Sequence, residues 1–304
     1  MRVLVTGACG FVGRHLLAEL AARGHTSVGM DKGPAPSDLP VQEFLPADIT
    51  HADAVKTAVR RLAPDACIHL AAIAFVPSGK LCPRTMTEVN VMGTVNLLEA
   101  LRTDSPTTRL LFVSTAQVYG TRARPAPARE DDALHPESLY GITKTAADGI
   151  SLLYARQYGM PVMVARPYNH IGPGQAPDYV VASFARQITA IRQGGPPVIR
   201  VGNLASRRDF TDVRDIVRAY CLLLEKGVQG RAYNIASGQQ VHIGEILTLL
   251  SELAGVQPQI ARDESLFRPD DNCLELDITR LRETTDWAPV IPLRQTLADI
   301  VNFP

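Results

Sequence analysis

The first thirty residues constrain the fold more than any other stretch of the chain. The apolar run Arg2–Thr6 is suited to a central parallel strand and leads directly into a glycine-rich turn, Gly7-Ala-Cys-Gly10-Phe-Val-Gly13. A helix is expected to follow over Phe11–Ala22. Glycines here permit a tight turn and let backbone N–H groups approach a pyrophosphate, while the helix N-terminus adds a favourable dipole. The stretch predicts a dinucleotide-binding βαβ unit, whose cofactor-contacting residues are Gly7, Gly10, Phe11, Val12 and Gly13.

The second expected strand, Thr26–Met30, ends at the acidic residue Asp31. A carboxylate at this position can accept hydrogen bonds from the diol of an adenine ribose, and it disfavours a 2′-phosphate. Lys32 follows directly and softens that preference. The sequence therefore indicates NAD(H) or NADP(H), with NAD(H) favoured. The alternative is that Asp31 is only a turn residue at the end of the strand.

Strands and helices continue to alternate. We expect a third strand ending at Asp48-Ile49, a helix over about 52–62, a fourth strand over 67–72 and a helix over about 85–101. This order predicts an α/β fold, a Rossmann-type doubly wound parallel sheet with right-handed crossovers, which binds ligands at the carboxyl ends of its strands. Further cofactor contacts are expected from Asp48, Ile49, Leu70, Ala71, Ala72 and Asn90.

A hydroxyl-bearing segment follows the next strand, Leu110–Val113, and contains Thr115. Further along, Tyr140-Gly-Ile-Thr-Lys144 places a tyrosine and a lysine four residues apart, on one face of a helix. A nearby ammonium group favours the phenolate and so lowers the pKa of the phenol, which can then pass a proton. The pair alone is common on surface helices. Its position after a dinucleotide-binding sheet predicts that Tyr140 and Lys144 take part in catalysis.

The pattern loosens after the strand Val162–Arg166, where we expect a smaller, interleaved C-terminal substrate-binding domain. The expected dinucleotide-binding domain covers 1–165, with about 205–235 returning to it, and the second domain covers 166–204 and 236–304. A turn-rich loop is expected over 167–175, and another loop gives Arg207-Arg208-Asp209-Phe210. Arg208 and Arg268 are suited to phosphate oxygens, although local ion pairs with Asp209 and Asp270 are the alternative. His69 and His170 are interpreted as core or loop histidines.

The whole chain resembles the extended short-chain dehydrogenase/reductase family. The resemblance lies in the three glycines, the Asp48-Ile49 pair, His69-Leu-Ala-Ala72, Asn90, the Ser114–Gly120 segment and Tyr140-x-x-x-Lys144. It implies that Tyr140 donates a proton, that Lys144 binds the nicotinamide ribose and lowers the pKa of the phenol, and that Thr115 holds the substrate oxygen. It also implies a nucleotide-sugar substrate and a homodimer formed through the helices at about 85–101 and 140–158. The substrate-binding residues it implies are Val76, Gln117, Asn169, Val180, Arg208 and Arg268.

Within that family the loop 166–175 resembles the GDP-4-dehydro-6-deoxy-D-mannose reductases. A 4,6-dehydratase carries a carboxylate two residues beyond the catalytic threonine, and this chain has Gln117 there. An amide cannot act as a general base near neutral pH, so chemistry at C4 alone is expected. The sequence thus favours NAD(P)H-dependent reduction of a GDP-4-keto-6-deoxyhexose. The alternatives are an NDP-sugar 4-epimerase, a 4-ketoreductase for dTDP or UDP sugars, and a cofactor-binding regulator.

Composition excludes several other classes of function. The 31 basic and 31 acidic residues cancel, so no overall field favours nucleic acid or an anionic membrane. The five cysteines follow no metal-ligand spacing, so no metal is expected, and they are interpreted as buried reduced thiols. No apolar run approaches the length of a membrane span, and a cytoplasmic location is expected.

Overall fold

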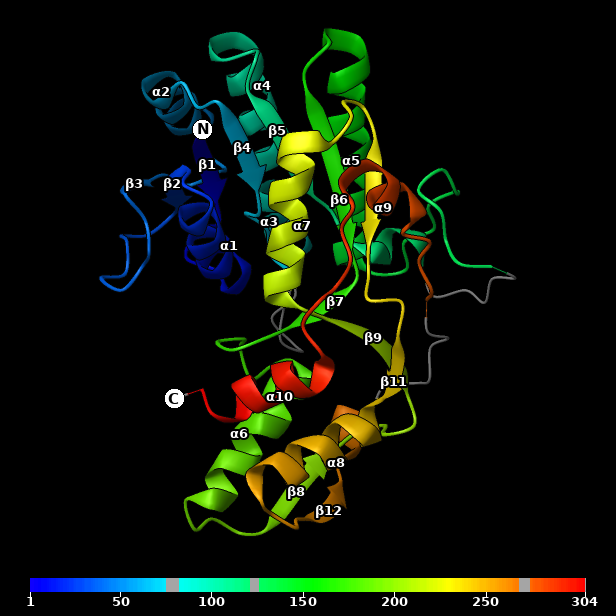
Figure 1. The fold of residues 1–304 in the computed structure, drawn as a ribbon. Helices are drawn as coiled ribbons and strands as arrows, with labels where there is room; N and C mark the ends of the chain where they lie inside the picture. Colours follow the sequence, from blue (N-terminus) through cyan, green and yellow to red (C-terminus); the bar gives the residue numbers. More distant parts are fainter. Residues whose placement is uncertain (75–81, 121–125, 268–273, 304) are drawn as a thin grey trace.

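The computed structural model describes residues 1–74, 82–120, 126–267 and 274–303 (Figure 1). Its main sheet has seven strands in the order β10-β6-β5-β4-β1-β2-β3, and every neighbouring pair is parallel. The order reverses direction at β1, which confirms the doubly wound architecture. The strands are β1 Arg2–Thr6, β2 Thr26–Asp31, β3 Glu43–Pro46, β4 Ala66–His69, β5 Arg109–Val113, β6 Val162–Pro167 and β10 Ala232–Ile235.

Helices cover both faces of this sheet. One face carries α1 Phe11–Ala22 and α7 Val213–Lys226, and the other carries α2 Ala52–Leu62, α4 Gly93–Asp104 and α5 Leu139–Tyr158 (Figure 1).

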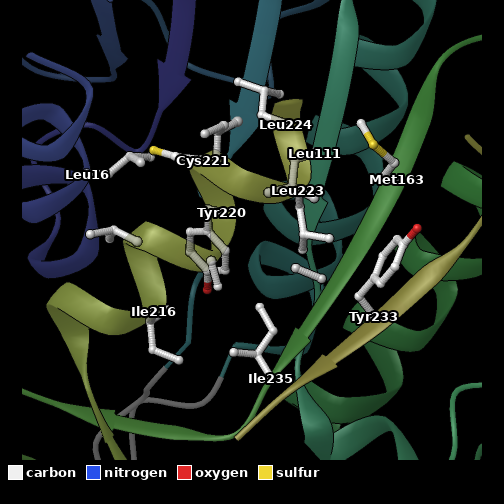
Figure 2. Close-up of a cluster of buried hydrophobic side chains, with 14 of the residues drawn as sticks. Leu16, Leu111, Met163, Ile216, Tyr220, Cys221, Leu223, Leu224, Tyr233 and Ile235 are labelled. Carbon is white, nitrogen blue, oxygen red and sulfur yellow. The ribbon is translucent and has the colours of Figure 1, made fainter. Parts of the chain in front are cut away.

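Side chains of β1 show why the sheet needs both layers. Val3 and Val5 belong to the core cluster under α1 and α7, whereas Leu4 belongs to the cluster under α2 and α4. Successive side chains of a strand point to opposite faces, so an uninterrupted apolar strand must be covered twice. Figure 2 shows the first cluster, in which Leu16 and Tyr220 from the helices face Leu111 and Met163 from the sheet.

A second core lies beyond the carboxyl ends of the main strands (Figure 1). It is built from α6 Val180–Arg192, α8 Ile243–Ala254, α10 Leu293–Val301 and the two-stranded sheet of β8 Val198–Val201 and β12 Gln259–Arg262, with the 3-10 helix η3 Glu264–Leu266 following β12. Between the two cores runs a small sheet in the order β11-β9-β7. Its strands are β7 Asn169–Ile171, β9 Arg207–Asp212 and β11 Gln240–His242.

Several predicted elements are corrected by the structure. The expected loops at 167–175 and 207–210 contain β7 and β9, because β9 pairs with β7 on one side and β11 on the other. The third and fourth strands end at Pro46 and His69, earlier than expected. The helix expected over 85–101 consists of three parts, namely α3 Pro83–Thr87, the π-helical turn η1 Glu88–Met92 and α4.

Part of the C-terminal segment packs in the first core. Residues 274–287 lie within the range expected for the second domain, but Leu281 and Trp287 are buried in the first core. The short helix α9 Thr279–Thr285 packs against α7 and β10, and the Trp287 indole donates to the Asp215 carbonyl oxygen at 3.0 Å. Burying a large aromatic ring contributes about 1.5–3 kcal/mol, so this segment adds to the stability of the first core.

The cysteines are not all buried. Cys67 and Cys221 are buried as expected and Cys9 is half-buried, but Cys82 is exposed at the start of α3. Cys273 lies outside the described residues. Among the helices that the structure describes, none combines the length and apolarity needed to cross a membrane.

Candidate active site

Two glycines at the start of the chain pack against neighbouring backbone without space for a side chain. Gly7 has a φ of 70°, and a Cβ atom there would lie 2.8 Å from the Ala71 backbone nitrogen. A Cβ atom on Gly13 would lie 2.6 Å from the Gly7 carbonyl oxygen. Neither position accepts a larger residue without a backbone shift. The turn therefore leads into the N-terminus of α1 with glycine backbone and no side chains at Gly7, Gly10 and Gly13; α1 begins at Phe11, after Gly10. Backbone N–H groups at a helix N-terminus suit a dinucleotide pyrophosphate.

Asp31 ends β2 beside this turn. Its carboxylate accepts hydrogen bonds from the Cys9 backbone nitrogen at 3.1 Å and the Lys32 backbone nitrogen at 2.8 Å. Each carboxylate oxygen retains a further lone pair, so the same side chain can also accept from a ribose hydroxyl. Asp31 thus serves as a turn residue and remains suited to the cofactor contact predicted for it.

The other expected cofactor residues lie along the carboxyl edge of the sheet. The Thr50 backbone and hydroxyl donate to Asp48 at 2.9 and 2.7 Å and hold the pKa of its carboxyl below the usual range. Ile49 is buried against Gly93, where a Cβ atom would lie 2.7 Å from its side chain. Leu70–Ala72 are half-buried beside Gly7, whereas Val12 lies in the first turn of α1.

The three expected catalytic residues come together from two elements. Thr115 caps the 3-10 helix η2 Ala116–Tyr119, and its hydroxyl is close enough to the Tyr140 phenol to affect the pKa of that phenol. Tyr140 is in the first turn of α5, whose N-cap Ser138 accepts from the Gly141 backbone nitrogen at 3.0 Å. Lys144 lies one turn further along the same helix and is 3% exposed. A buried hydroxyl, a half-buried phenol and a buried ammonium group therefore share one region.

The electrostatics of this group differ from the sequence-based expectation. Burial raises the pKa of Tyr140, the Tyr179 phenol raises it further, and the neighbouring Thr115 hydroxyl lowers it. Burial also lowers the pKa of Lys144 to about 7, against a smaller opposing effect of Asp148. The pKa of the phenol is therefore raised overall, because desolvation disfavours the charged form of both side chains.

Lys144 is expected to lower the stability of the fold. A lysine that releases its proton near pH 7 when folded and near 10.5 when unfolded makes the unfolded chain bind more protons between those values. Lys144→Met is therefore expected to raise the free energy of unfolding by its full amount below about pH 7 and by progressively less as the pH rises toward 10.5. Thermal midpoints of both proteins at a series of pH values measure this difference. A pH-independent difference, or an equal one for the exposed Lys226→Met, would contradict it.

The residues expected to bind substrate occupy four separate elements. Gln117 is exposed in η2, and its side-chain oxygen accepts from the Ser138 hydroxyl at 3.1 Å. Asn169 in β7 donates to the Asp209 carbonyl oxygen at 3.3 Å. Val180 is the first residue of α6, and Arg208 in β9 is half-buried. Val76 and Arg268 lie outside the described residues.

Asp209, the neighbour considered as an ion-pair partner of Arg208, fixes a turn of the chain. It is buried, and its carboxylate accepts from the Ser237 backbone at 3.0 Å, the Ser237 hydroxyl at 2.7 Å and the Gly238 backbone at 2.7 Å. The carboxylate thus holds the turn between β10 and β11. His170 has a packing role, since its ring stacks on Phe11 with the centroids 6.3 Å apart.

Sequence reasoning missed three contributors to this region. The Phe112 ring lies under the Lys144 ammonium, 4.4 Å from the ring centroid, and Tyr179 is close enough to Tyr140 to affect its pKa. Both contacts are tertiary and have no local signal. Ser138 had one, because a serine two residues before Tyr140, at the start of a helix, matches the N-cap preference.

The sheet order, the glycine turn at the end of β1 and the Thr–Tyr–Lys group define a dinucleotide-dependent enzyme of the short-chain dehydrogenase/reductase class. Within that class, the chain belongs to the family described as GDP-mannose 4,6 dehydratase, whose model matches residues 4–300.

Individual relatives differ in the reaction that their names state. The chain is 38% identical to a GDP-6-deoxy-D-mannose reductase from Pseudomonas aeruginosa, over 99% of this chain and 96% of that protein. It is 33% identical to a UDP-glucose 4-epimerase from Mycolicibacterium smegmatis, over 100% and 98%. Among solved structures, RMD from Pseudomonas aeruginosa complexed with NADPH superposes with a TM-score of 0.86 at 36% identity, covering 99% of this chain and 97% of that one. The Thermus thermophilus UDP-glucose 4-epimerase complex with NAD gives a TM-score of 0.86 at 30% identity, covering 99% and 98%.

Proposed function

We propose that this protein is an NAD(P)H-dependent reductase of the C4 ketone of a GDP-4-keto-6-deoxyhexose. The observation that carries the proposal is the amide of Gln117, which stands where elimination requires a carboxylate and accepts a hydrogen bond from Ser138. The Thr115 hydroxyl and the Tyr140 phenol, which are close enough to affect each other, supply the polar groups that reduction of a ketone requires. The relative with 38% identity, a GDP-6-deoxy-D-mannose reductase, supports the same substrate class.

Each catalytic side chain has a distinct task. When bound, the reduced nicotinamide supplies the hydride that C4 of the sugar accepts. The C4 oxygen gains negative charge as this bond forms, and Tyr140 transfers its phenolic proton to that oxygen. Thr115 orients the same oxygen, and Lys144 stabilises the phenolate that Tyr140 becomes before it regains a proton from solvent. The products are the C4 alcohol and one oxidised cofactor.

The effect of Gln117 on the reaction can be tested by following exchange of the proton on C5 of the sugar. A ketone at C4 acidifies the C5 proton, but Gln117 cannot remove it. We expect the wild-type protein to catalyse no deuterium incorporation at C5 in heavy water, measured by mass spectrometry of the recovered 4-keto sugar, and Gln117→Glu to catalyse detectable incorporation. Gln117→Met, which adds no base, is the matched control. Exchange at C5 by the wild-type protein would contradict the assignment.

A 4-epimerase is the second candidate, because it uses the same tyrosine, lysine and hydroxyl, and one relative with 33% identity is a UDP-glucose 4-epimerase. An epimerase oxidises and then reduces the same carbon, so it consumes no cofactor. Turnover of an NDP-sugar without added reduced cofactor would favour the epimerase. One oxidised cofactor per product favours the reductase.

Recognition of the cofactor and substrate follows the residues placed above. Asp31 beside the glycine turn favours NAD(H) over NADP(H), although one solved relative holds NADPH and another holds NAD. Asn169, Val180 and Arg208 are proposed to contact the nucleotide sugar, with the Arg208 guanidinium on its diphosphate. Affinities for NADH and NADPH, measured by fluorescence titration of wild-type protein and Asp31→Asn, test the cofactor preference.

A homodimer is proposed to form through α4 and α5. Ile142 and Leu153 on α5 are 52% and 42% exposed, and Met92 just before α4 is 49% exposed. These apolar side chains lie on neighbouring helices that can pack against their symmetry mates. Light scattering is expected to give twice the 33.0 kDa of one chain, and Ile142→Arg to give a monomer. Val228→Arg, at an exposed apolar residue outside these helices, is expected to remain dimeric. A monomeric wild-type protein would contradict the proposal.

The two cores are proposed to correspond to a dinucleotide-binding domain and a nucleotide-sugar-binding domain, with the small sheet β11-β9-β7 between them. The cytoplasm remains the proposed compartment, because Cys9, Cys67, Cys82 and Cys221 are all free thiols.

A further inference from the structure

A buried histidine at the end of β4 is bonded through both ring nitrogens. His69 is 1% exposed, its Nδ1 lies 2.6 Å from the Thr6 hydroxyl oxygen, and its Nε2 lies 3.0 Å from the Thr94 hydroxyl oxygen. Thr6 ends β1 and is the register partner of His69, whereas Thr94 is in the first turn of α4. Hydrogen bonds to both nitrogens fix the orientation of this buried ring, which a histidine that only fills space in the core would not need.

The available protons fix the direction of each hydrogen bond. Thr94 donates its only hydroxyl proton to the Asn90 carbonyl oxygen at 2.8 Å, so it must accept from His69 Nε2–H. The Thr6 hydroxyl oxygen accepts from the Ala71 backbone nitrogen at 3.2 Å, and its own proton faces Nδ1 of the ring. The neutral imidazole protonated at Nε2 satisfies all four bonds. The other neutral tautomer sets two protons between His69 Nδ1 and the Thr6 hydroxyl and leaves no proton between Nε2 and the Thr94 hydroxyl oxygen.

The same chain of hydrogen bonds reaches the catalytic helix. The Asn90 side chain accepts from the Ile73 backbone nitrogen at 2.8 Å and donates to the Thr143 hydroxyl at 3.0 Å. Thr143 in turn donates to the Tyr140 carbonyl oxygen at 2.9 Å. The chain therefore runs from Ala71, against which Gly7 packs without space for a Cβ atom, to the backbone of the catalytic tyrosine.

We propose that His69 is a positioning residue whose neutral Nε2–H tautomer holds the cofactor-facing backbone at Ala71 and the first turn of α5 in register. The proposal rests on the function proposed above for Tyr140. Burial, and to a lesser extent the Lys144 ammonium, lower the pKa of His69 to about 3. The ring is therefore neutral wherever the enzyme works, and the chain of bonds does not change with pH in that range.

The tautomer can be observed directly in the wild-type protein. Long-range proton–nitrogen spectra of protein labelled with ¹⁵N-histidine are expected to contain one neutral Nε2–H ring that does not titrate between about pH 5 and pH 9. This signal is expected to disappear in His69→Gln, which assigns it. A His69 ring that protonates near its ordinary pKa of about 6.5, or one that carries its proton on Nδ1, would overturn the proposal.

The positioning effect can be measured by NADPH binding. Thr94→Val keeps the shape of the side chain but removes the hydroxyl, and we expect it to raise the Kd for NADPH about tenfold and to lower kcat. Thr94→Ser restores the hydroxyl and is expected to bind within about twofold of wild type. The control is Thr108→Val, which removes another buried threonine hydroxyl, bonded to the Pro64 carbonyl oxygen at 2.6 Å, at the opposite edge of the sheet.

A double variant tests whether the residues act as one chain. If they do, the factors by which His69→Leu and Thr94→Val each weaken NADPH binding do not multiply in the double variant. The proposal would be overturned if Thr94→Ser or Thr108→Val lost as much NADPH affinity as Thr94→Val. It would also be overturned if the losses of affinity in His69→Leu and Thr94→Val multiplied in the double variant. Affinity for NADPH and the histidine tautomer do not depend on which sugar is reduced, so they remain informative if the proposed substrate is wrong.

Discussion

Tyr140→Phe is expected to lower turnover of a GDP-4-keto-6-deoxyhexose roughly 10²- to 10⁴-fold, the usual contribution of a positioned general acid. The substitution removes one oxygen from a side chain in the first turn of α5, beside Thr115. The hydride acceptor then develops negative charge without a proton donor. Because desolvation raises the pKa of the phenol, it is protonated at neutral pH and can serve as that donor.

The loss is expected in kcat, while NADPH affinity remains near that of wild type. Steady-state kinetics and fluorescence titration measure the two quantities separately. Tyr158→Phe is the matched control, since Tyr158 is 47% exposed at the other end of the same helix. Near-wild-type turnover by Tyr140→Phe would show that the proton comes from another group, and the mechanism would be wrong.

Arg166→Met is expected to destabilise the fold by about 3–5 kcal/mol, measured by chemical denaturation. Arg166 in β6 and Asp148 in α5 form a bidentate ion pair, with Nε–Oδ2 at 2.9 Å and Nη2–Oδ1 at 3.0 Å. Their side chains are 3% and 1% exposed. Arg166 also donates to the Tyr119 hydroxyl and to the Glu130 carbonyl oxygen, both at 2.9 Å. Removing the guanidinium leaves a buried carboxylate without its partner.

The penalty comes from the unpaired charge, so a second substitution is expected to reduce it. Arg166→Met combined with Asp148→Leu should be more stable than Arg166→Met alone. Arg60 and Asp104 provide a comparison, because this pair has a similar distance of 3.0 Å but the Arg60 side chain is 65% exposed. Arg60→Met is expected to cost less than about 1 kcal/mol. A similarly small cost for Arg166→Met would contradict this account.

The main sheet and the placement of Tyr140 and Lys144 on one helix could be predicted from the sequence because their signals are local. The glycine spacing after Arg2–Thr6, the acid at Asp31 and the four-residue step from Tyr140 to Lys144 each lie within one element. Strands and helices of the first half alternate, so their order alone predicts that the carboxyl ends of the parallel strands lie along one edge of the sheet.

Features that depend on distant partners could not be predicted in this way. β7 and β9 are strands because they pair with each other and because β9 also pairs with β11, and nothing in their own residues requires it. Folding takes Tyr140 and Lys144 out of water together, and desolvation is the largest cause of the pKa shift of each side chain. The role inferred for His69 depends on hydroxyls of residues 25 or more positions away in the sequence.

One measurement tests the proposed reductase directly. The protein is incubated with a GDP-4-keto-6-deoxyhexose and a reduced cofactor that carries deuterium at the transferable position, and both products are quantified. The account predicts one oxidised cofactor per sugar reduced and one deuterium on C4 of the resulting GDP-6-deoxyhexose. Consumption of the sugar without oxidised cofactor, or a product without deuterium at C4, would contradict it.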